Sequence, residues 1–472
     1  MLACEVLRAA AAVFGFVFFV HALSPALTSG DSRWTVPVAL SLLERGDTNL
    51  DEYLDLIREN GYYAAECVRP PDAVAGPAMG DCAGGHIYNR YPIGVPVLAA
   101  PVVFAIRVSL DLAEPWLARP ALFGIHPIID AFLRADLIGS RALVEMLVAS
   151  FFIALAAALM ALTAGRFLAV RRAVGLALVF AFATPAWSTG SRALYQHGPS
   201  MLVATIAIWL LAREDRRAIH FVGAGAAAAL GYAVRPTNLL LLVVIALFVV
   251  HRHRRFFLAY AAGSAAVLAC FLTYNFSIYG RALPSYYSQT PPPLDSWQAL
   301  AWILHSLAAQ LGSPNRGLLI FTPVFLFSLA GLWRAFRTRW LAPLPAYLAA
   351  LAALQTAVVA RYYDFWTGGH CYGPRLTSDL APLLVFLLIP LLADWSRAGF
   401  APRRTLGLFG AAILFSVFVH ARGALSVETH RWNIDPVDVD HHQQRVWDWR
   451  DLQFLRGIVI RPGLTHETPA SL

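Results

Sequence analysis

Long apolar segments alternate with short polar connections along almost the whole chain. The first segment runs from about Leu7 to Thr28, and similar segments of about 15 to 23 residues recur as far as residue 421. A helix needs about 20 residues to cross the hydrocarbon core of a bilayer. Ten further spans are predicted at about 143–164, 173–190, 198–212, 219–234, 237–250, 256–273, 317–334, 342–360, 378–394 and 405–421. The pattern therefore predicts an all-α polytopic integral membrane protein.

Composition agrees with this fold class. Of the 472 residues, 58% are hydrophobic and only 14% are charged, whereas about a quarter of the residues in an ordinary soluble domain are charged. These values exclude a water-soluble globular enzyme, a disordered chain and a small disulfide-rich domain. The net charge is +8, and every basic residue is an arginine. Because the arginines lie in short connections between apolar segments, we expect membrane lipids as partners and no nucleic acid.

Arginine is distributed unevenly between alternate connections, which predicts the orientation of the chain. Short cytoplasmic loops of membrane proteins carry an excess of basic residues. The connections placed in the cytoplasm contain Arg166, Arg171 and Arg172; Arg213, Arg216 and Arg217; Arg252, Arg254 and Arg255; Arg334, Arg337 and Arg339; and Arg397, Arg403 and Arg404. The connections between them hold few arginines and are placed outside. The N-terminus is then expected inside and the C-terminus outside.

One region leaves the number of spans open. Residues 92–112 are apolar enough to cross, but a single crossing there would put the connection at Arg166 on the wrong side. Either residues 117–138 cross as well, for a total of 13 spans, or both segments lie along the outer interface, for a total of 11. The expected domains are a membrane domain of residues 1–421, with external loops at 29–91 and 274–316, and a periplasmic tail of residues 422–472.

Cys67 and Cys82 lie in the same predicted external loop. A compartment outside the cytoplasm permits a disulfide between them, and the sequence leaves open whether one forms. The spacing of Cys and His residues is not that of a metal-binding motif.

Polar residues with specific chemistry concentrate in the external connections, and the first of these begins with Asp31, just beyond the first span. A carboxylate at the rim of an apolar cleft can take a proton from a bound hydroxyl group. Asp31 is therefore the candidate catalytic base; the alternative is a carboxylate that only marks the end of the helix. Amphipathic stretches near 34–43 and 50–57 suit the membrane interface. The candidate binding residues of this loop are Arg33, His86, Tyr88 and Arg90.

Two tight external connections carry further candidates. Arg192, Tyr195 and His197 lie in the first of them. His197 is a candidate for binding an anion or a sugar hydroxyl group, or else it caps the helix that follows. Arg235 joins two spans so tightly that it must lie at the outer rim, where it either extends toward water or meets an anion.

The external loop of residues 274–316 adds more candidate binding residues. Tyrosine and asparagine side chains can stack on a sugar and hydrogen-bond to it, although tyrosine is also the usual anchor at a membrane interface. The candidates in this loop are Tyr274, Asn275, Tyr286, Tyr287 and Arg316.

The segment of residues 361–375 has the densest set of candidates. A glycine pair at 368–369 with aromatic neighbours allows the backbone to approach a ligand closely, and Arg375 can donate two hydrogen bonds to a phosphate. The alternative is a packed turn in which Arg375 pairs with Asp379, four residues further along. The candidate binding residues of this segment are Asp364, Trp366, His370, Tyr372 and Arg375.

Together these residues resemble the GT-C superfamily of polytopic glycosyltransferases, in particular its bacterial members similar to protein mannosyltransferases and to the lipid A aminoarabinose transferase. The resemblance covers most of the chain. It includes an aspartate just past the first span, interfacial helices in the first external loop, a Tyr-Pro-x-Gly entry at Tyr91 into the next apolar segment, and an odd number of spans. The family commonly has a pair of acidic residues in the first loop, whereas here Asp31 is followed by Ser32.

The resemblance implies a polyprenyl-phosphate sugar donor and an acceptor that is a glycan, a lipid or a protein, in the bacterial inner membrane with the site facing the periplasm. The acceptor hydroxyl group would attack the anomeric carbon with inversion while Asp31 accepts its proton. Arg375, helped by Arg316, Arg192 or Arg235, would offset the charge on the departing phosphate. Participation of a divalent metal ion, Mg²⁺ or Mn²⁺, is left open. Trp366, Tyr372, Tyr286 and Tyr287 would frame the sugar or the isoprenoid.

Three alternatives remain open at this point, one of which is a structural membrane protein without activity. A transporter or flippase of a lipid-linked glycan predicts ionisable groups near the bilayer midplane and related half-structures. A glycan ligase or polymerase would share the donor and differ in the size of the acceptor.

Overall fold

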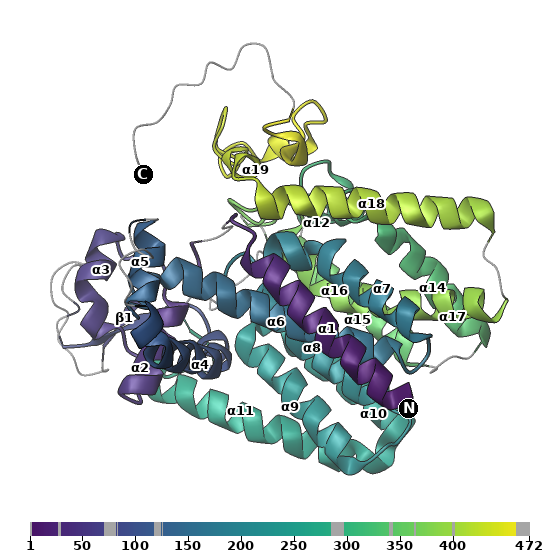
Figure 1. Ribbon diagram of the computed structural model, residues 1–472, viewed down its shortest axis with the longest axis horizontal. Helices are drawn as coiled ribbons and strands as arrows, with labels where there is room; N and C mark the ends of the chain where they lie inside the picture. The colour runs from purple at the N-terminus through teal and green to yellow at the C-terminus, as the bar shows by residue number, and fades with distance from the viewer. Residues whose placement is uncertain are drawn as a thin grey trace.

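The computed structural model describes residues 2–26, 30–69, 82, 84–117, 124, 126–284, 297–338, 343–362, 365–398 and 402–458. Within this part, almost all regular structure is helical, and strands occur only as one short antiparallel pair. The predicted all-α class is confirmed. Figure 1 shows a helical bundle with the elements of the first loop at one end and the α19 region beside it.

Helices occur at every position where the sequence predicts a span, because an apolar backbone segment in lipid must satisfy its hydrogen bonds internally. α6 lies in the middle of the bundle and packs against α1, α7 and α8, while α9 packs against α8 and α11. α11 ends at Gly280, whose φ of 65° is the left-handed conformation that terminates many helices. The bundle helices are α1 (Leu2–Ala22), α6 (Arg141–Ala164), α7 (Val170–Phe182), α8 (His197–Leu211), α9 (Ala218–Val234), α10 (Leu239–His253), α11 (Phe257–Tyr279), α13 (Leu318–Phe321), α14 (Leu326–Thr338), α15 (Leu344–Ala360), α16 (Ala381–Phe386), α17 (Leu388–Arg397) and α18 (Arg403–Leu425).

Short helical turns connect several of these helices. They are η3 (Ala186–Gly190), η4 (Pro236–Asn238), η5 (Arg254–Phe256), η7 (Pro323–Phe325) and η8 (Arg375–Leu380). Among the described residues, six helical segments are long and apolar enough to cross a membrane: Cys4–Ala22, Gly94–Leu117, Arg141–Ala164, Pro236–Tyr279, Arg375–Arg397 and Arg403–Leu425. The predicted membrane character is thereby supported.

Several of the arginine-rich turns lie together at one end of the bundle. Arg166, after α6, donates a hydrogen bond of 2.8 Å to the carbonyl oxygen of Trp209 in α8. The guanidinium group of Arg213, after α8, lies 5.5 Å from the centre of the Trp209 ring. Arg172, at the start of α7, donates to the hydroxyl group of Ser396 in α17. These contacts agree with the prediction that the basic connections share one side of the membrane.

The first loop folds into a small unit of its own at the opposite end. It contains α2 (Thr35–Glu44), η1 (Asp51–Tyr53) and α3 (Leu54–Glu59), close to the two predicted amphipathic stretches. β1 (Ala65–Val68) and β2 (His86–Asn89) pair with Cys67 opposite Ile87. Cys67 and Cys82 form a disulfide, with 5.6 Å between their Cα atoms, which answers the question that the sequence left open.

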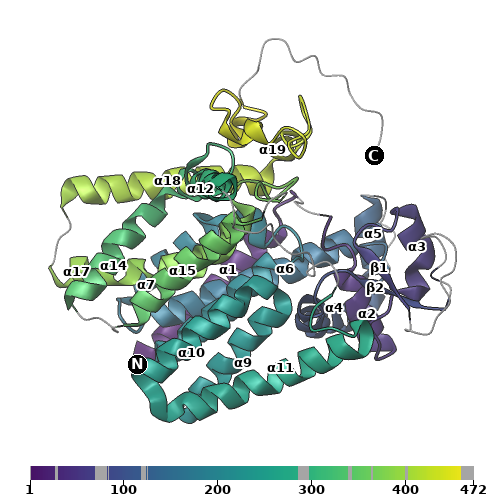
Figure 2. The same cartoon turned by 180° about the vertical axis from the view of Figure 1, so that it is seen from behind.

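α4 (Gly94–Leu117) runs across the direction of the bundle. Figures 1 and 2 both show α4 almost end-on, whereas α6 and α11 extend across the picture. α4 packs against α2 of the first loop. In the described part of residues 117–138, the one complete helix is α5 (Pro127–Leu133). Its seven residues span about 10 Å, which is far too short to cross a bilayer.

A third unit lies over the loops at the same end of the molecule as the first-loop unit. We call it the cap. It comprises α12 (Trp297–Gly312), the loop around Trp366, α19 (Glu428–Arg431), η9 (Gln443–Trp447) and η10 (Gln453–Leu455). Its core contains Trp366 and Trp432, both buried. The cap therefore joins residues on both sides of α18 into one hydrophobic cluster.

Candidate active site

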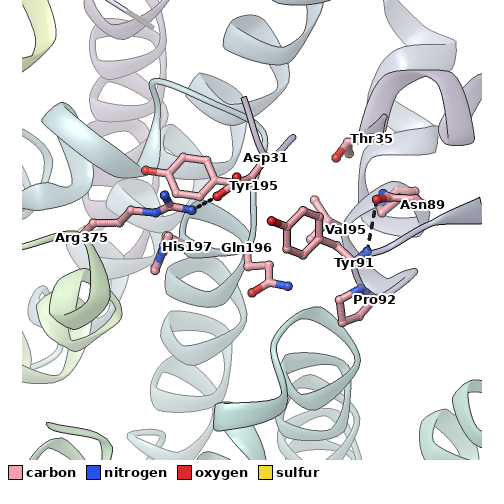
Figure 3. Close-up of a pocket in the computed structure, with 11 residues that line it drawn as sticks. Asp31, Thr35, Asn89, Tyr91, Pro92, Val95, Tyr195, Gln196, His197 and Arg375 are labelled. Atoms are coloured by element: carbon pink, nitrogen blue, oxygen red, sulfur yellow. Dashed lines mark hydrogen bonds and ion pairs between the residues drawn. The ribbon is translucent and has the colours of Figure 1, made fainter. Parts of the chain in front are cut away.

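A small cavity of about 30 Å³ lies where the bundle meets the first loop. Asp31 reaches it from the turn before α2, Asn89 from the end of β2, and Arg375 from the first position of η8 (Figure 3). Its lining residues are Asp31, Thr35, Asn89, Tyr91, Pro92, Val95, Pro96, Tyr195, Gln196, His197 and Arg375. One wall is apolar, from the start of α4, and the opposite wall carries the charged groups.

Asp31 and Arg375 form an ion pair on this cavity, although they are 344 residues apart in the chain. The hydroxyl group of Tyr63 donates a hydrogen bond of 2.5 Å to Oδ1 of Asp31, while Arg375 donates to Oδ2. The guanidinium group lies 4.8 Å from the centre of the Tyr195 ring, within cation–π distance. The side chains of Arg375 and Asp31 are 16% and 17% exposed. The alternative in which Arg375 pairs with Asp379 is therefore wrong.

Asp379 instead belongs to a buried network beside the cavity. Its Oδ1 lies 2.6 Å from Nδ1 of His197, and its Oδ2 accepts a hydrogen bond from Arg235. The side chains of His197, Asp379 and Arg235 are only 4%, 6% and 7% exposed. Arg235 therefore meets an anion, which is one of the two alternatives expected from the sequence. The anion is Asp379, a carboxylate of the protein itself.

The glycine-rich loop before Arg375 is shaped by backbone conformations that other residues adopt only with strain. Gly368 and Gly369 have φ angles of 80° and 66°, in the left-handed region that favours glycine. The carbonyl oxygen of Gly368 faces Nη1 of Arg375 at 3.4 Å. The loop thereby helps to aim the guanidinium group at the cavity.

Glu145 was missed in the sequence, although it links two segments that carry residues of the site. It lies in α6, is 7% exposed, and accepts a hydrogen bond from the hydroxyl group of Ser32. It also accepts a hydrogen bond from the backbone of Leu194. Glu145 therefore links Ser32, which is next to Asp31, with Leu194, which is next to Tyr195. A lone carboxylate inside an apolar segment was the available signal, because such residues are costly in membranes and commonly functional.

No protein-family model, no curated protein and no solved structure matches the chain. The interpretation of the site therefore depends on its geometry and chemistry.

Of the residues proposed from the sequence, Asp31, Tyr195, His197 and Arg375 line the cavity. Lining residues that were not proposed as binding residues include Asn89, Tyr91 and Gln196. Tyr91 was visible only as part of the Tyr-Pro-x-Gly motif. Tyr63 touches Asp31 from the first loop, and no feature of the sequence indicated that contact.

Arg192 and Arg316, expected to assist at the phosphate, do not line the cavity. Arg192 is fully buried and donates to the carbonyl oxygens of His21 and Ser24, and its burial lowers the pKa of its guanidinium group to about 9. Arg316 donates to the carbonyl oxygen of Thr367 at 2.8 Å and to further oxygens of the cap. Burial also lowers the pKa of Arg316. Both arginines are occupied by protein oxygens, which corrects the prediction that they help to bind a phosphate.

The aromatic candidates of the segment 361–375 are core residues. The Tyr372 hydroxyl group donates 2.6 Å to the carbonyl oxygen of Val419, and the side chain is 1% exposed. Trp366 is 2% exposed and donates to the side chain of Gln443. These two rings therefore do not frame a ligand in this cavity, contrary to the prediction.

Most other candidates lie in the first-loop unit or its contact with α11, outside the cavity lining. Tyr274 and Asn275, expected in an external loop, are in the last turns of α11, because the helix continues to Tyr279. Tyr286, Tyr287 and Asp364 lie outside the described residues. The remaining candidates form hydrogen bonds with protein groups: Arg33 with Asn60 at 2.5 Å, His86 with Asp51 at 2.6 Å, Tyr274 with Thr48 at 2.9 Å, and Asn275 with the Ala282 carbonyl oxygen at 3.0 Å. The ring of Tyr88 lies 6.0 Å from the ring of Tyr279. Arg90 is exposed just after β2.

A group that could hold a divalent metal ion lies in the cap. Ligand atoms of His370, Asp438 and Asp440 are all within 4.8 Å of one another. One imidazole and two carboxylates suit Zn²⁺ or Mn²⁺. In the cavity lining, by contrast, Asp31 is the sole carboxylate among the described residues, and it pairs with Arg375. The metal-ligand chemistry thus fits the cap better than the cavity.

Proposed function

We propose that this protein is a glycosyltransferase resembling the GT-C superfamily. It transfers a glycosyl group, with inversion, from a polyprenyl-phosphate donor to a glycan, lipid or protein acceptor at the outer face of the bacterial inner membrane. The observation that carries the proposal is the meeting of Asp31 and Arg375 on one cavity beside the apolar start of α4.

The chemistry of the cavity supports an anionic lipid head group as ligand. A guanidinium group stays protonated and can donate two parallel hydrogen bonds to phosphate oxygens. Arg375 is partly accessible from the cavity and is oriented by the Tyr195 ring and by the Gly368 carbonyl oxygen. Pro92, Val95 and Pro96 provide an apolar wall, along which an isoprenoid can lie. When the phosphate departs, Arg375 offsets its developing charge.

The arrangement in the membrane follows from the same proposal. The helix α4 crosses the direction of the bundle and packs on α2, which supports a position along the outer interface. Residues 92–138 then contribute no crossing, the chain has 11 spans, and the N-terminus lies in the cytoplasm while the cap lies in the periplasm. The cavity faces the periplasm, where lipid-linked sugars replace nucleotide sugars as donors.

The proposal is tested by deleting the gene and comparing envelope glycans by mass spectrometry. A sugar that disappears and returns with the wild-type gene, but not with Arg375→Ala, supports glycosyl transfer. The lipid-linked form of that sugar is then supplied as the donor to vesicles that contain the purified protein. Accumulation of an unchanged complete glycan on the wrong side of the membrane indicates a flippase and contradicts the proposal. Transfer of a whole oligosaccharide indicates a ligase or polymerase.

A further inference from the structure

We propose that His197, oriented by Asp379, accepts the proton of the acceptor hydroxyl group, and that Asp31 does not. This inference rests on the proposed glycosyl transfer and assigns its proton acceptor.

Asp31 is poorly placed to act as a base. Tyr63 donates to one of its carboxylate oxygens and Arg375 to the other. Hydrogen bonds to the ionised carboxylate and an adjacent positive charge both stabilise that form, and so they weaken its affinity for a proton. In this geometry Asp31 instead holds Arg375 and Tyr63 at the edge of the cavity.

His197 has the geometry of an oriented general base. Its Nδ1 lies 2.6 Å from Oδ1 of Asp379. Asp379 also accepts from Arg235 and is therefore ionised, so the short contact requires a proton on Nδ1 of His197. A neutral imidazole with its proton on Nδ1 has its lone pair on Nε2. Because His197 also lines the cavity, Nε2 is the nitrogen available to a ligand hydroxyl group.

Burial disfavours the imidazolium form of His197, and the neighbouring charges act on it in both directions. Asp379 stabilises the imidazolium ion, whereas Arg235, whose Nη1 is 3.2 Å from Nδ1, and Arg375 oppose it. The ring of Tyr195 packs edge-on at 4.9 Å, and Tyr362 interacts electrostatically with Arg235 and Asp379. A phosphate bound to Arg375 would offset one of the opposing charges. Donor binding would therefore raise the basicity of His197 at the point where a base is needed.

The proposed step balances. The acceptor oxygen forms a bond to the anomeric carbon, and the bond from that carbon to the phosphate oxygen breaks. The electron pair of the broken bond leaves with the polyprenyl phosphate, beside Arg375. The hydroxyl proton moves to Nε2 of His197 and passes to the phosphate or to water when the products leave. Asp379 remains ionised throughout, which is the role of the orienting carboxylate in other histidine bases.

The experiment uses the full-length protein in vesicles, with the lipid-linked sugar identified by the gene deletion. Rates are measured against pH for the wild type, His197→Ala, His197→Gln, Asp379→Asn and Asp31→Asn. We expect the wild-type rate to fall at acidic pH, as His197 becomes protonated. Both His197 variants should lose about 10²- to 10⁴-fold in kcat, with little change in the KM for the donor. Added imidazole should restore part of the activity of His197→Ala only.

A matched control is His420→Gln. His420 is also a buried histidine, hydrogen-bonded at 2.8 Å to both Ser188 and Thr322, but it does not line the cavity. Thermal unfolding of every variant separates lost folding from lost chemistry. We expect His420→Gln to keep the pH profile of the wild type, whatever its effect on thermal stability.

Three results would overturn the assignment. One is a His197→Ala protein with wild-type kcat and pH dependence. Another is loss of the acidic limb in Asp31→Asn alone, which would identify Asp31 as the base. Loss of activity in His197→Ala without imidazole rescue, and with an unchanged pH profile of the residual rate, also counts against it. If the wild type transfers no sugar at all, the proposed function itself fails, and this result is distinct from the other three.

Discussion

Because Asp31 pairs with Arg375, we expect substitutions at these two positions to have opposite effects on the affinity for a phosphate. A phosphate that binds Arg375 must compete with the carboxylate of Asp31, which already holds the guanidinium group. Asp31→Asn removes the competing negative charge and frees Arg375. We therefore expect Asp31→Asn to bind undecaprenyl phosphate more tightly than the wild type, and Arg375→Ala to bind it more weakly.

The magnitude follows from the environment of the pair. With side chains 16% and 17% exposed, the pair lies between surface ion pairs, worth up to about 1 kcal/mol, and buried ones, whose disruption costs about 3–5 kcal/mol. Release of Arg375 is then worth about 1–2 kcal/mol, or roughly a 10-fold tightening in Asp31→Asn. Loss of the charge-assisted hydrogen bonds in Arg375→Ala costs about 2 kcal/mol or more, roughly a 30-fold weakening.

The assay is equilibrium binding of undecaprenyl phosphate to protein in nanodiscs, with the phosphate-free polyprenol as reference ligand. Asp55→Asn is the matched control, because Asp55 is a carboxylate of the same loop whose side chain is 93% exposed. It should leave the affinity unchanged. Weaker binding in Asp31→Asn, or equal affinity for the polyprenol and its phosphate in the wild type, would refute the competition between Asp31 and the ligand.

Three further predictions concern the units around the site. Replacing both Cys67 and Cys82 by serine should lower the free energy of unfolding by about 3 kcal/mol, because the disulfide closes a loop of 15 residues. The protease sensitivity of the first loop will measure this effect, and a sensitivity equal to that of the wild type would contradict it. Glu145→Ala should cost about 1–3 kcal/mol in thermal unfolding because Ser32 loses its acceptor, whereas Glu145→Gln, which keeps a carbonyl oxygen, should cost less. Burial, together with the charge of Arg316, lowers the pKa of His430 to about 4, so the unfolded chain binds the extra proton between about pH 6.5 and 4. Cap stability should fall as pH drops through this window, and a His430→Gln protein, unlike His441→Gln, should lose that dependence in melting curves.

The helical architecture could be predicted from the sequence because a bilayer leaves an apolar backbone few alternatives. The approach of Asp31 and Arg375 could also be anticipated, since both lie in connections placed on the same side of the membrane. The position of α4 could not, because its apolar composition suits a span and an interfacial helix equally. Its packing on α2 and its direction across the bundle, seen in the structure, are the observations on which the proposed interfacial position rests.

Arginine roles were the least predictable part of the site. Arg192, Arg316 and Arg375 are equivalent by residue type and by predicted location, yet the first two are surrounded by carbonyl oxygens and only the third lines the cavity. Which partner a guanidinium group finds depends on how distant backbone segments pack. The sequence carries no local signal for that. Glu145, in contrast, was recognisable as an unusual carboxylate in an apolar helix.

Arg316 has a consequence for the order in which the protein is assembled. It donates to Asn433 and Gln453, which lie more than a hundred residues further along the chain, and also to the backbone of Gly369. During synthesis, the segment that carries Arg375 leaves the ribosome well before Gln453 does. Until the last part of the chain has been synthesised, the buried guanidinium group of Arg316 lacks several of its acceptors. Maturation of the cap is thus a late event that depends on completed translation, and a prematurely terminated chain would be recognisable to quality-control proteases by this unfinished region.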